Sequence, residues 1–354
     1  MTEYKNDLFS LPLTYKRLEE ICSGLSAHCP SLCVSTLAYS VCGRRIPYLC
    51  IGKGRRTVLY VAGHHASEWI CGLPLLAFAG ELCAIGGRGS AAKIGGENNA
   101  ENTAENTAKD VARPFAAGEG RSHGALPERE AVSHSPAPGQ DPFCTPRLLE
   151  QYRFLIVPQL NPDGTALQQN GPDPAHLLYR RQMTMNGGDP DFTHWQANAR
   201  GVDLNHNYSV GFCEYRQLEA ERGILGGAPS LYSGAYPESE PETASLANLV
   251  RLLRPSLILT LHTQGEEIFF DAPHATPAMH RMAEGLAALT GYRPAVAAST
   301  AAYGGLTDWA VRCGIPSFTL ECGKGENPLP LSDAPDIYRR LRPALFCAPQ
   351  LSYL

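Results

Sequence analysis

Short apolar runs that alternate with longer amphipathic segments limit the fold of this chain more than any other feature. Strand-like runs occupy residues 46–52, 57–62, 153–160, 256–262 and 315–321. Apolar residues recur at helical spacing in residues 12–28, 240–253, 276–290 and 335–346, and residues 68–85 are apolar over a length that suits a buried helix. Strands that alternate with helices form parallel or mixed sheets covered on both faces, so the pattern predicts an α/β fold. Pro74 lies inside residues 68–85 and predicts a kink or a later helix start there.

Residues 86–146 interrupt this pattern with a composition that cannot form a core. The segment is rich in Gly, Ala, Asn, Glu and Pro, repeats the letters AENT and has few large apolar residues. It buries too little apolar surface to offset its ordering entropy, which predicts disorder. Because another core strand follows it, we expect one domain over residues 1–354 with an inserted segment. A linker between two domains is the alternative.

Composition and charge exclude several functional classes. The 30 basic and 35 acidic residues give a net charge of −5 without a basic stripe, which argues against nucleic-acid binding. No run approaches the ~18 consecutive apolar residues of a transmembrane helix, so we expect no membrane partner. The N-terminus has no apolar stretch typical of a signal peptide, and none of the 12 cysteines forms a CxxC pair. These features predict reduced thiols and a cytoplasmic location.

Histidines and glutamates follow three of the predicted strands. His65 and Glu68 come directly after the run TVLYVA, His262 ends SLILTLH, and Glu321 ends IPSFTLE. The carboxyl ends of parallel strands meet at one edge of a sheet, where ligands gather. Two imidazoles and a carboxylate, with water in the fourth position, make a catalytic zinc site. A further carboxylate can take a proton from that water. Spacing alone leaves His64 as a competitor of His65, because His64 and Glu68 are four residues apart.

The polar loop from Ala199 to Tyr208 carries further candidates. Arg200 can donate hydrogen bonds to an oxyanion, and Asn205 can fix a carboxylate or an amide. The alternative is an Asn/Gly turn with a solvated arginine.

Segments taken in order along the chain resemble the zinc carboxypeptidase family. They are GHHASEWI at 63–70, LNPDG at 160–164, GVDLNHNY at 201–208, SEPET at 239–243, and the pair LHTQGEE at 261–267 and FTLECGKGENPLP at 318–330. The last pair is similar to one branch, the γ-D-glutamyl-meso-diaminopimelate peptidases, which act on bacterial cell-wall peptides. The resemblance covers most of the chain outside 86–146. It implies a mixed, largely parallel eight-stranded sheet with helices on both faces.

The resemblance also implies residue roles. His65, Glu68 and His262 match the ligands of one Zn²⁺ ion, which leaves His64 a structural role. Glu321 matches the general base, which later passes its proton to the leaving amine. Arg200 corresponds to the arginine that polarises the scissile carbonyl.

The residues expected to bind the substrate include two departures from the family pattern. Asn205 matches the asparagine that binds the substrate carboxylate, but His206 replaces the arginine with which the exopeptidases grip a free C-terminus. A neutral imidazole is a poorer anchor than a guanidinium, so the change favours a substrate that extends past the cleaved bond or carries different charges there. The mobile tyrosine of the exopeptidases aligns with Thr300, and Tyr303 reaches that space only if the loop shifts. Thr307 falls at the pocket floor and, being small and uncharged, indicates no charge preference.

Together with these residues, the resemblance implies a zinc metallopeptidase that hydrolyses the γ-D-glutamyl–meso-diaminopimelate bond of murein peptides. A cytoplasmic location points to soluble fragments and a role in recycling or sporulation. An ordinary metallocarboxypeptidase and an amide deacylase share the same site and are the first alternatives. A peptide-binding module without turnover is the other. The oligomeric state stays open.

Overall fold

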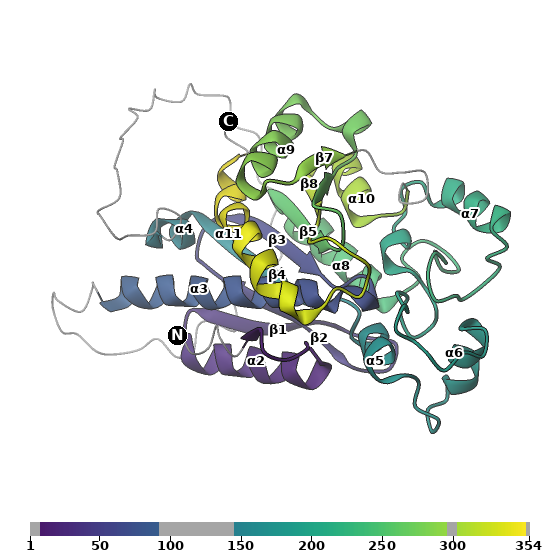
Figure 1. Cartoon of the computed structure of the whole chain (residues 1–354). Coiled ribbons are helices and arrows are strands. Elements are labelled where there is room, and N and C mark those ends of the chain that lie inside the picture. Colours follow the sequence, from purple (N-terminus) through teal and green to yellow (C-terminus); the bar gives the residue numbers. More distant parts are fainter. Residues whose placement is uncertain (1–7, 92–144, 296–302, 352–354) are drawn as a thin grey trace.

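A single eight-stranded sheet forms the centre of the computed structural model, which describes residues 8–91, 145–295 and 303–351 (Figure 1). The strands follow the spatial order β1-β2-β4-β3-β5-β8-β6-β7. Their bounds are β1 Leu32–Tyr39, β2 Arg45–Ile51, β3 Arg56–Ala62, β4 Tyr152–Val157, β5 Leu257–His262, β6 Glu267–Phe269, β7 Arg293–Ala295 and β8 Ser317–Glu321. Parallel pairings join β4, β3, β5 and β8 at the centre, and antiparallel pairings join β1 to β2, β2 to β4 and β6 to β8. The predicted mixed sheet is confirmed.

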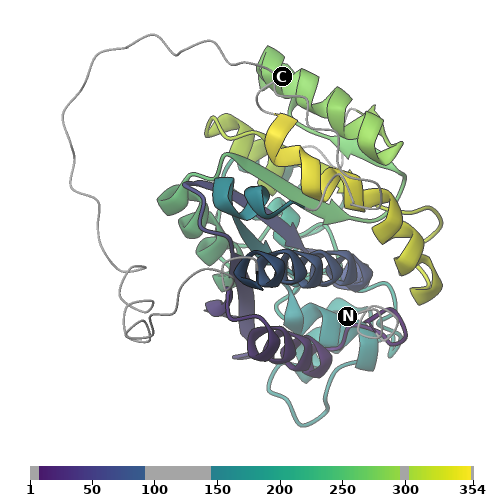
Figure 2. The same ribbon diagram turned by 90° about the vertical axis from the view of Figure 1, so that its left-hand side faces the viewer.

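Helices pack on both faces of this sheet (Figures 1 and 2). Their bounds are α2 Tyr15–His28, η1 Ala66–Cys71, α3 Gly72–Ala91, α4 Pro146–Gln151, α5 Pro162–Asn170, α6 Tyr179–Met185, η2 Leu204–His206, α7 Phe212–Glu221, α8 Pro241–Leu253, η3 Ala272–His274, α9 Pro277–Thr290, α10 Leu306–Arg312, η4 Leu331–Asp333 and α11 Ala334–Leu351. Alternate residues of the strands face opposite layers. Val58 and Tyr60 of β3 join the core under α2, α3, α9 and α11, whereas Leu59 and Val61 join the core under α8 and α10.

The central strands and the long helices lie where the sequence pattern predicts them. The strands β1, β6 and β7 were not predicted, because β1 is an edge strand with irregular burial and the other two have three residues each. The short helices α4, α5, α6, α7 and α10 were also not predicted. Elements of this length carry too few apolar repeats to reveal a period.

The segment around Pro74 shows the later helix start that the proline predicts. The chain first forms η1, and α3 begins only at Gly72. Pro74 therefore lies in the first turn of α3, where a missing backbone N–H breaks no helical hydrogen bond.

The predicted insertion begins later than residue 86. Helix α3 continues to Ala91, with Ile85 still 4% exposed and Gly86 packed close to Ser31. The predicted start was wrong because small residues and glycines at the end of a buried helix resemble the composition of a disordered segment. Residues 92–144, which hold most of the predicted insertion, lie outside the described residues.

One described stretch, Ala66–Gly87, is long and apolar enough to cross a membrane by length and composition. Glu68 and Glu81 interrupt the stretch, so it contains no run of ~18 consecutive apolar residues, and the expectation that was stated for such runs is not contradicted. Most of the stretch is buried inside the domain. Its leucines and Phe78 pack in the core between the sheet and the neighbouring helices, which accounts for the composition.

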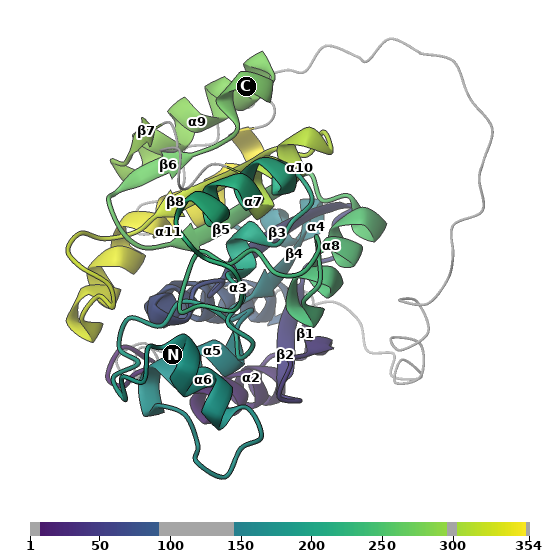
Figure 3. The same cartoon turned by 90° about the vertical axis from the view of Figure 1, so that its right-hand side faces the viewer.

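The carboxyl ends of β3, β5 and β8 point toward the same edge of the sheet, because these strands are parallel neighbours. Helices α5, α6 and α7 and the loops between them lie on this side of the molecule, which Figure 3 views directly. The fold thus brings the loops that follow distant strands into one region.

Candidate metal centre and active site

The histidines and the glutamate that follow β3 and β5 meet at the carboxyl edge of the sheet. After β3 the backbone turns at Gly63, whose φ is +72° and where an added Cβ would lie 3.2 Å from Gln159 Cα. His65 then precedes η1, and Glu68 follows one helical turn later on the same side. His262 is the last residue of the neighbouring β5. Short connections from rigid strands therefore fix all three side chains.

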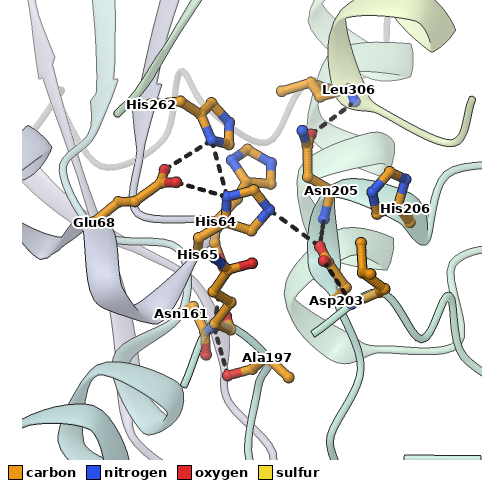
Figure 4. Close-up of polar contacts among 12 residues, drawn as sticks. His64, His65, Glu68, Asn161, Ala197, Asp203, Asn205, His206, His262 and Leu306 are labelled. Atoms are coloured by element: carbon orange, nitrogen blue, oxygen red, sulfur yellow. Dashed lines mark hydrogen bonds and ion pairs between the residues drawn. The ribbon is translucent and has the colours of Figure 1, made fainter. Parts of the chain in front are cut away.

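His65, Glu68 and His262 form a cluster with the dimensions of a zinc site (Figure 4). Their ligand atoms all lie within 4.8 Å of one another. Nδ1 of His65 lies 3.0 Å from Glu68 Oε1, Nδ1 of His262 lies 2.9 Å from Glu68 Oε2, and the two Nδ1 atoms are 3.3 Å apart. Zinc bonds of about 2.0–2.1 Å in tetrahedral geometry separate neighbouring ligand atoms by about 3.3 Å. The donor types and the spacing therefore fit Zn²⁺.

The charges in this cluster favour an ionised Glu68 carboxylate. Burial alone would raise the pKa of Glu68, but the adjacent His65 and His262 outweigh it and lower the pKa to about 2. Burial likewise opposes a charge on His65, but Glu68 and Asp203 together raise the pKa of its imidazole. The cluster is thus a buried carboxylate held between two imidazoles, and a dication that binds there takes the place of a proton on His65.

Asp203 orients His65 from the side away from Glu68. Its Oδ1 lies 3.2 Å from Nε2 of His65, and burial leaves the carboxylate 1% exposed. A carboxylate on the second ring nitrogen fixes the tautomer and the ring orientation of a ligating histidine. Asp203 lies inside the segment GVDLNHNY, but the sequence does not reveal which ligand its side chain reaches.

His64 lies behind the cluster. It is fully buried, its Nε2 is 3.1 Å from the Tyr208 hydroxyl, and its ring stacks on His262 with centroids 5.5 Å apart. Burial, together with the neighbouring imidazoles of His262 and His65, lowers the pKa of His64. A neutral ring stacked on His262 supports the position of that ligand.

Glu321 ends β8 directly beside His262, with which it is paired in the parallel register. Burial, followed by the negative charge of Glu68, raises the pKa of the Glu321 carboxyl well above its usual range. A bound dication would act in the opposite direction. Glu321 is therefore a carboxylate next to the metal cluster but outside it, as a proton acceptor must be.

Arg200 is anchored to a residue outside the cluster. Its Nε donates a hydrogen bond to Oε2 of the buried Glu240 at 2.8 Å, while the side chain stays 40% exposed. Glu240 also accepts a hydrogen bond from Asn198 Nδ2 at 2.7 Å. The ion pair fixes Nε of Arg200. The role of Arg200 in catalysis stays a prediction.

Asn205 and His206 are neighbours in η2 but have different surroundings. Asn205 is half-buried beside Asp203, and its Oδ1 accepts a hydrogen bond from the backbone N–H of Leu306 at 3.3 Å. His206 is only 5% exposed, stacks on Tyr215 with centroids 3.9 Å apart, and places Nδ1 2.9 Å from the carbonyl oxygen of Tyr303. In Figure 4 its ring lies beyond Asn205, away from the three ligands. Burial lowers the pKa of His206, so its ring is a poor anchor for a carboxylate.

The other two substrate-binding candidates differ in exposure. Tyr303 is 42% exposed and covers Gly211, where an added Cβ would lie 2.5 Å from the tyrosine ring. Thr307 is buried, and its hydroxyl lies 2.8 Å from the Thr319 hydroxyl and accepts a hydrogen bond from Ser317. Thr300 lies outside the described residues.

The chain matches the model of a known protein family on both sides of the predicted insertion. That family is described as zinc carboxypeptidase, and the match covers residues 18–94 and 145–342. A γ-D-glutamyl-L-diamino acid endopeptidase of Lysinibacillus sphaericus is 28% identical over 313 residues, which are 88% of this chain and 65% of that protein. Human carboxypeptidase B is 29% identical over 191 residues, 49% of this chain and 42% of that protein. The chain therefore spans less than two thirds of the length of these relatives.

Solved structures of carboxypeptidases share the fold. Bovine thrombin-activatable fibrinolysis inhibitor, solved with a tick carboxypeptidase inhibitor, gives a TM-score of 0.61 at 18% identity over 98% of this chain and 99% of that chain. Carboxypeptidase A of Helicoverpa armigera gives a TM-score of 0.62 at 15% identity over 97% and 74%. The family match, the shared fold and the His-Glu-His cluster agree with one another, and the chain belongs to the zinc carboxypeptidase family of metallopeptidases.

Proposed function

We propose that the protein hydrolyses the amide bond between a γ-D-glutamyl residue and a diamino acid such as meso-diaminopimelate in bacterial cell-wall peptides. The observation that carries this proposal is the relative named γ-D-glutamyl-L-diamino acid endopeptidase, whose similarity extends over 88% of the chain. His206 supports it, because a buried imidazole of lowered pKa cannot replace the arginine that grips a free C-terminus in exopeptidases.

The proposed mechanism assigns one task to each residue around the cluster. His65, Glu68 and His262 would hold the ion. Bound zinc would supply Lewis acidity and lower the pKa of a water molecule toward about 7. Glu321 takes a proton from the attacking water and returns it to the leaving amine. Arg200 donates to the developing oxyanion, and Asn205, with its amide oxygen engaged by Leu306, offers its Nδ2 group to the substrate.

The substrate assignment is tested with L-Ala-γ-D-Glu-meso-diaminopimelate, with and without an added D-Ala, and mass spectrometry of the products. Zinc-loaded protein should release diaminopimelate from the first peptide and diaminopimelyl-D-Ala from the second. A metallocarboxypeptidase would instead cleave ordinary L-peptides and lose those with a blocked C-terminus. A deacylase would prefer N-acyl amino acids. Either result, with both murein peptides left uncleaved, would refute the substrate assignment. It would not contradict the zinc site.

The role of Arg200 is tested by Arg200→Gln. Loss of one donor to an oxyanion lowers kcat about 10²–10³-fold, so we expect a fall of this size with unchanged zinc affinity. Arg222→Gln, on an exposed side chain at the end of α7, is the control. A variant with normal kcat and lower thermal stability would show instead that Arg200 only neutralises Glu240.

We further propose that the protein acts in the cytoplasm on soluble peptides. The cysteines of the described residues are all free thiols, as is usual in a reducing compartment.

A further inference from the structure

Two stretches mark the branch, HTQGEE and GENPLP, and only His262 of the first belongs to the metal cluster. The structure brings them into contact through one residue of each. Thr263 follows His262 and is 5% exposed, and Asn327 lies in the loop after β8. Thr263 Oγ1 donates a hydrogen bond to Asn327 Oδ1 at 2.7 Å, and Asn327 Nδ2 donates to the carbonyl oxygen of Thr263 at 2.9 Å.

The same amide group of Asn327 also reaches the metal cluster. Its Nδ2 donates to Oε1 of Glu68 at 3.3 Å. The side-chain amide cannot flip by 180° and keep these hydrogen bonds. Its oxygen would then face two acceptors, the Glu68 carboxylate and the Thr263 carbonyl oxygen. His194 holds the backbone of Asn327 from the other side, with Nδ1 3.0 Å from its carbonyl oxygen. Asn327 therefore has one orientation, in which an N–H group points at Glu68.

We propose that Asn327 is a positioning residue that holds Glu68 in its metal-binding conformation, and that Thr263 sets the orientation of Asn327. A glutamate side chain has several rotatable bonds, and fixing them before the ion binds removes an entropy cost from binding. Removing a hydrogen-bond partner of a ligating residue typically lowers the metal affinity 10–100-fold. This role concerns the ion and not the peptide, so it holds whichever substrate is cleaved.

The test measures the zinc Kd by competition with a chromophoric chelator. Asn327→Asp keeps the shape but places a carboxylate against Glu68, and we expect its Kd to rise about 10–100-fold. Thr263→Val removes the hydroxyl at nearly constant shape and should raise the Kd about tenfold, whereas Thr263→Ser should restore the wild-type value.

Thr290→Val is the matched control. Thr290 is also 5% exposed, and its hydroxyl also donates to a carbonyl oxygen, that of Leu286 in α9, while it accepts a hydrogen bond from the backbone N–H of Tyr292. It should lower stability as Thr263→Val does but leave the zinc Kd unchanged. In the cobalt-substituted protein, the visible spectrum should shift in Asn327→Asp and not in Thr290→Val.

Zinc Kd values within twofold of wild type in both Asn327→Asp and Thr263→Val would overturn the proposal. If Asn327→Asp does not fold, the two Thr263 variants decide between the outcomes. Equal Kd values for Thr263→Val and Thr263→Ser would then show that the hydroxyl does not act on the metal site. Both readouts are independent of peptide cleavage, so they separate this proposal from the substrate assignment.

Discussion

Replacing Glu321 with glutamine should lower kcat about 10²–10⁴-fold while the zinc affinity stays near that of the wild type. The amide has nearly the shape of the carboxylate but cannot accept a proton from water. Glu321 is beside His262 in the sheet register but is not one of the three clustered ligands. The substitution therefore removes the proton acceptor and leaves the metal site intact.

Two companion variants sharpen this comparison. Glu284→Gln changes an exposed glutamate of α9 and should keep wild-type kcat and zinc affinity. His262→Ala removes a ligand and should lose zinc and activity together. If Glu321→Gln also lost zinc, Glu321 would act as a ligand. If it retained kcat within threefold of wild type, the proton acceptor would be another group.

The position of the metal cluster could be predicted from sequence for a simple physical reason. His65, His262 and Glu321 each lie at or just beyond the end of an apolar run that can only be a core strand, and the ends of parallel strands converge. Local sequence therefore determines a long-range arrangement. The covering of both faces of the sheet by helices follows from the same alternation of elements, whereas the order of the strands was not predicted.

The surroundings of the individual side chains could not be predicted, because they depend on contacts between distant segments. Arg200 pairs with Glu240, forty residues further along the chain, and His206 stacks on Tyr215 of a helix that was not predicted. Asn327 donates a hydrogen bond to Glu68, which lies 259 residues earlier in the chain. Hydrogen bonds of this kind leave no periodic signal in the sequence, so only the folded structure reveals which polar residue serves which ligand.

We expect a substitution of Glu242 to have the largest effect on the free energy of unfolding. It is fully buried in the first turn of α8, Oε1 accepts a hydrogen bond from the backbone of Val41 at 3.3 Å, and Oε2 has no partner among the described residues. Burial, with smaller contributions from the nearby charges of Glu240 and Asp163, raises the pKa of Glu242 from 4.5 to about 7. Below pH 4.5 the carboxyl is protonated in both the folded and the unfolded chain. Between pH 4.5 and 7 the unfolded chain ionises more readily, so the free energy of unfolding falls by about 1.4 kcal/mol per pH unit.

Glu242→Gln removes this titration and should therefore stabilise the protein at alkaline pH. The difference in the free energy of unfolding between variant and wild type should grow from near zero at pH 4.5 to about 3 kcal/mol at pH 8. Urea denaturation at both pH values, at one zinc concentration, measures it, because the titration of all other groups cancels in the difference. Glu284→Gln, an exposed glutamate, should show a difference that does not change with pH. If the difference in the free energy of unfolding between Glu242→Gln and wild type also did not change with pH, Glu242 would already be ionised in the folded protein. Its Oε2 would then have a partner such as a buried water.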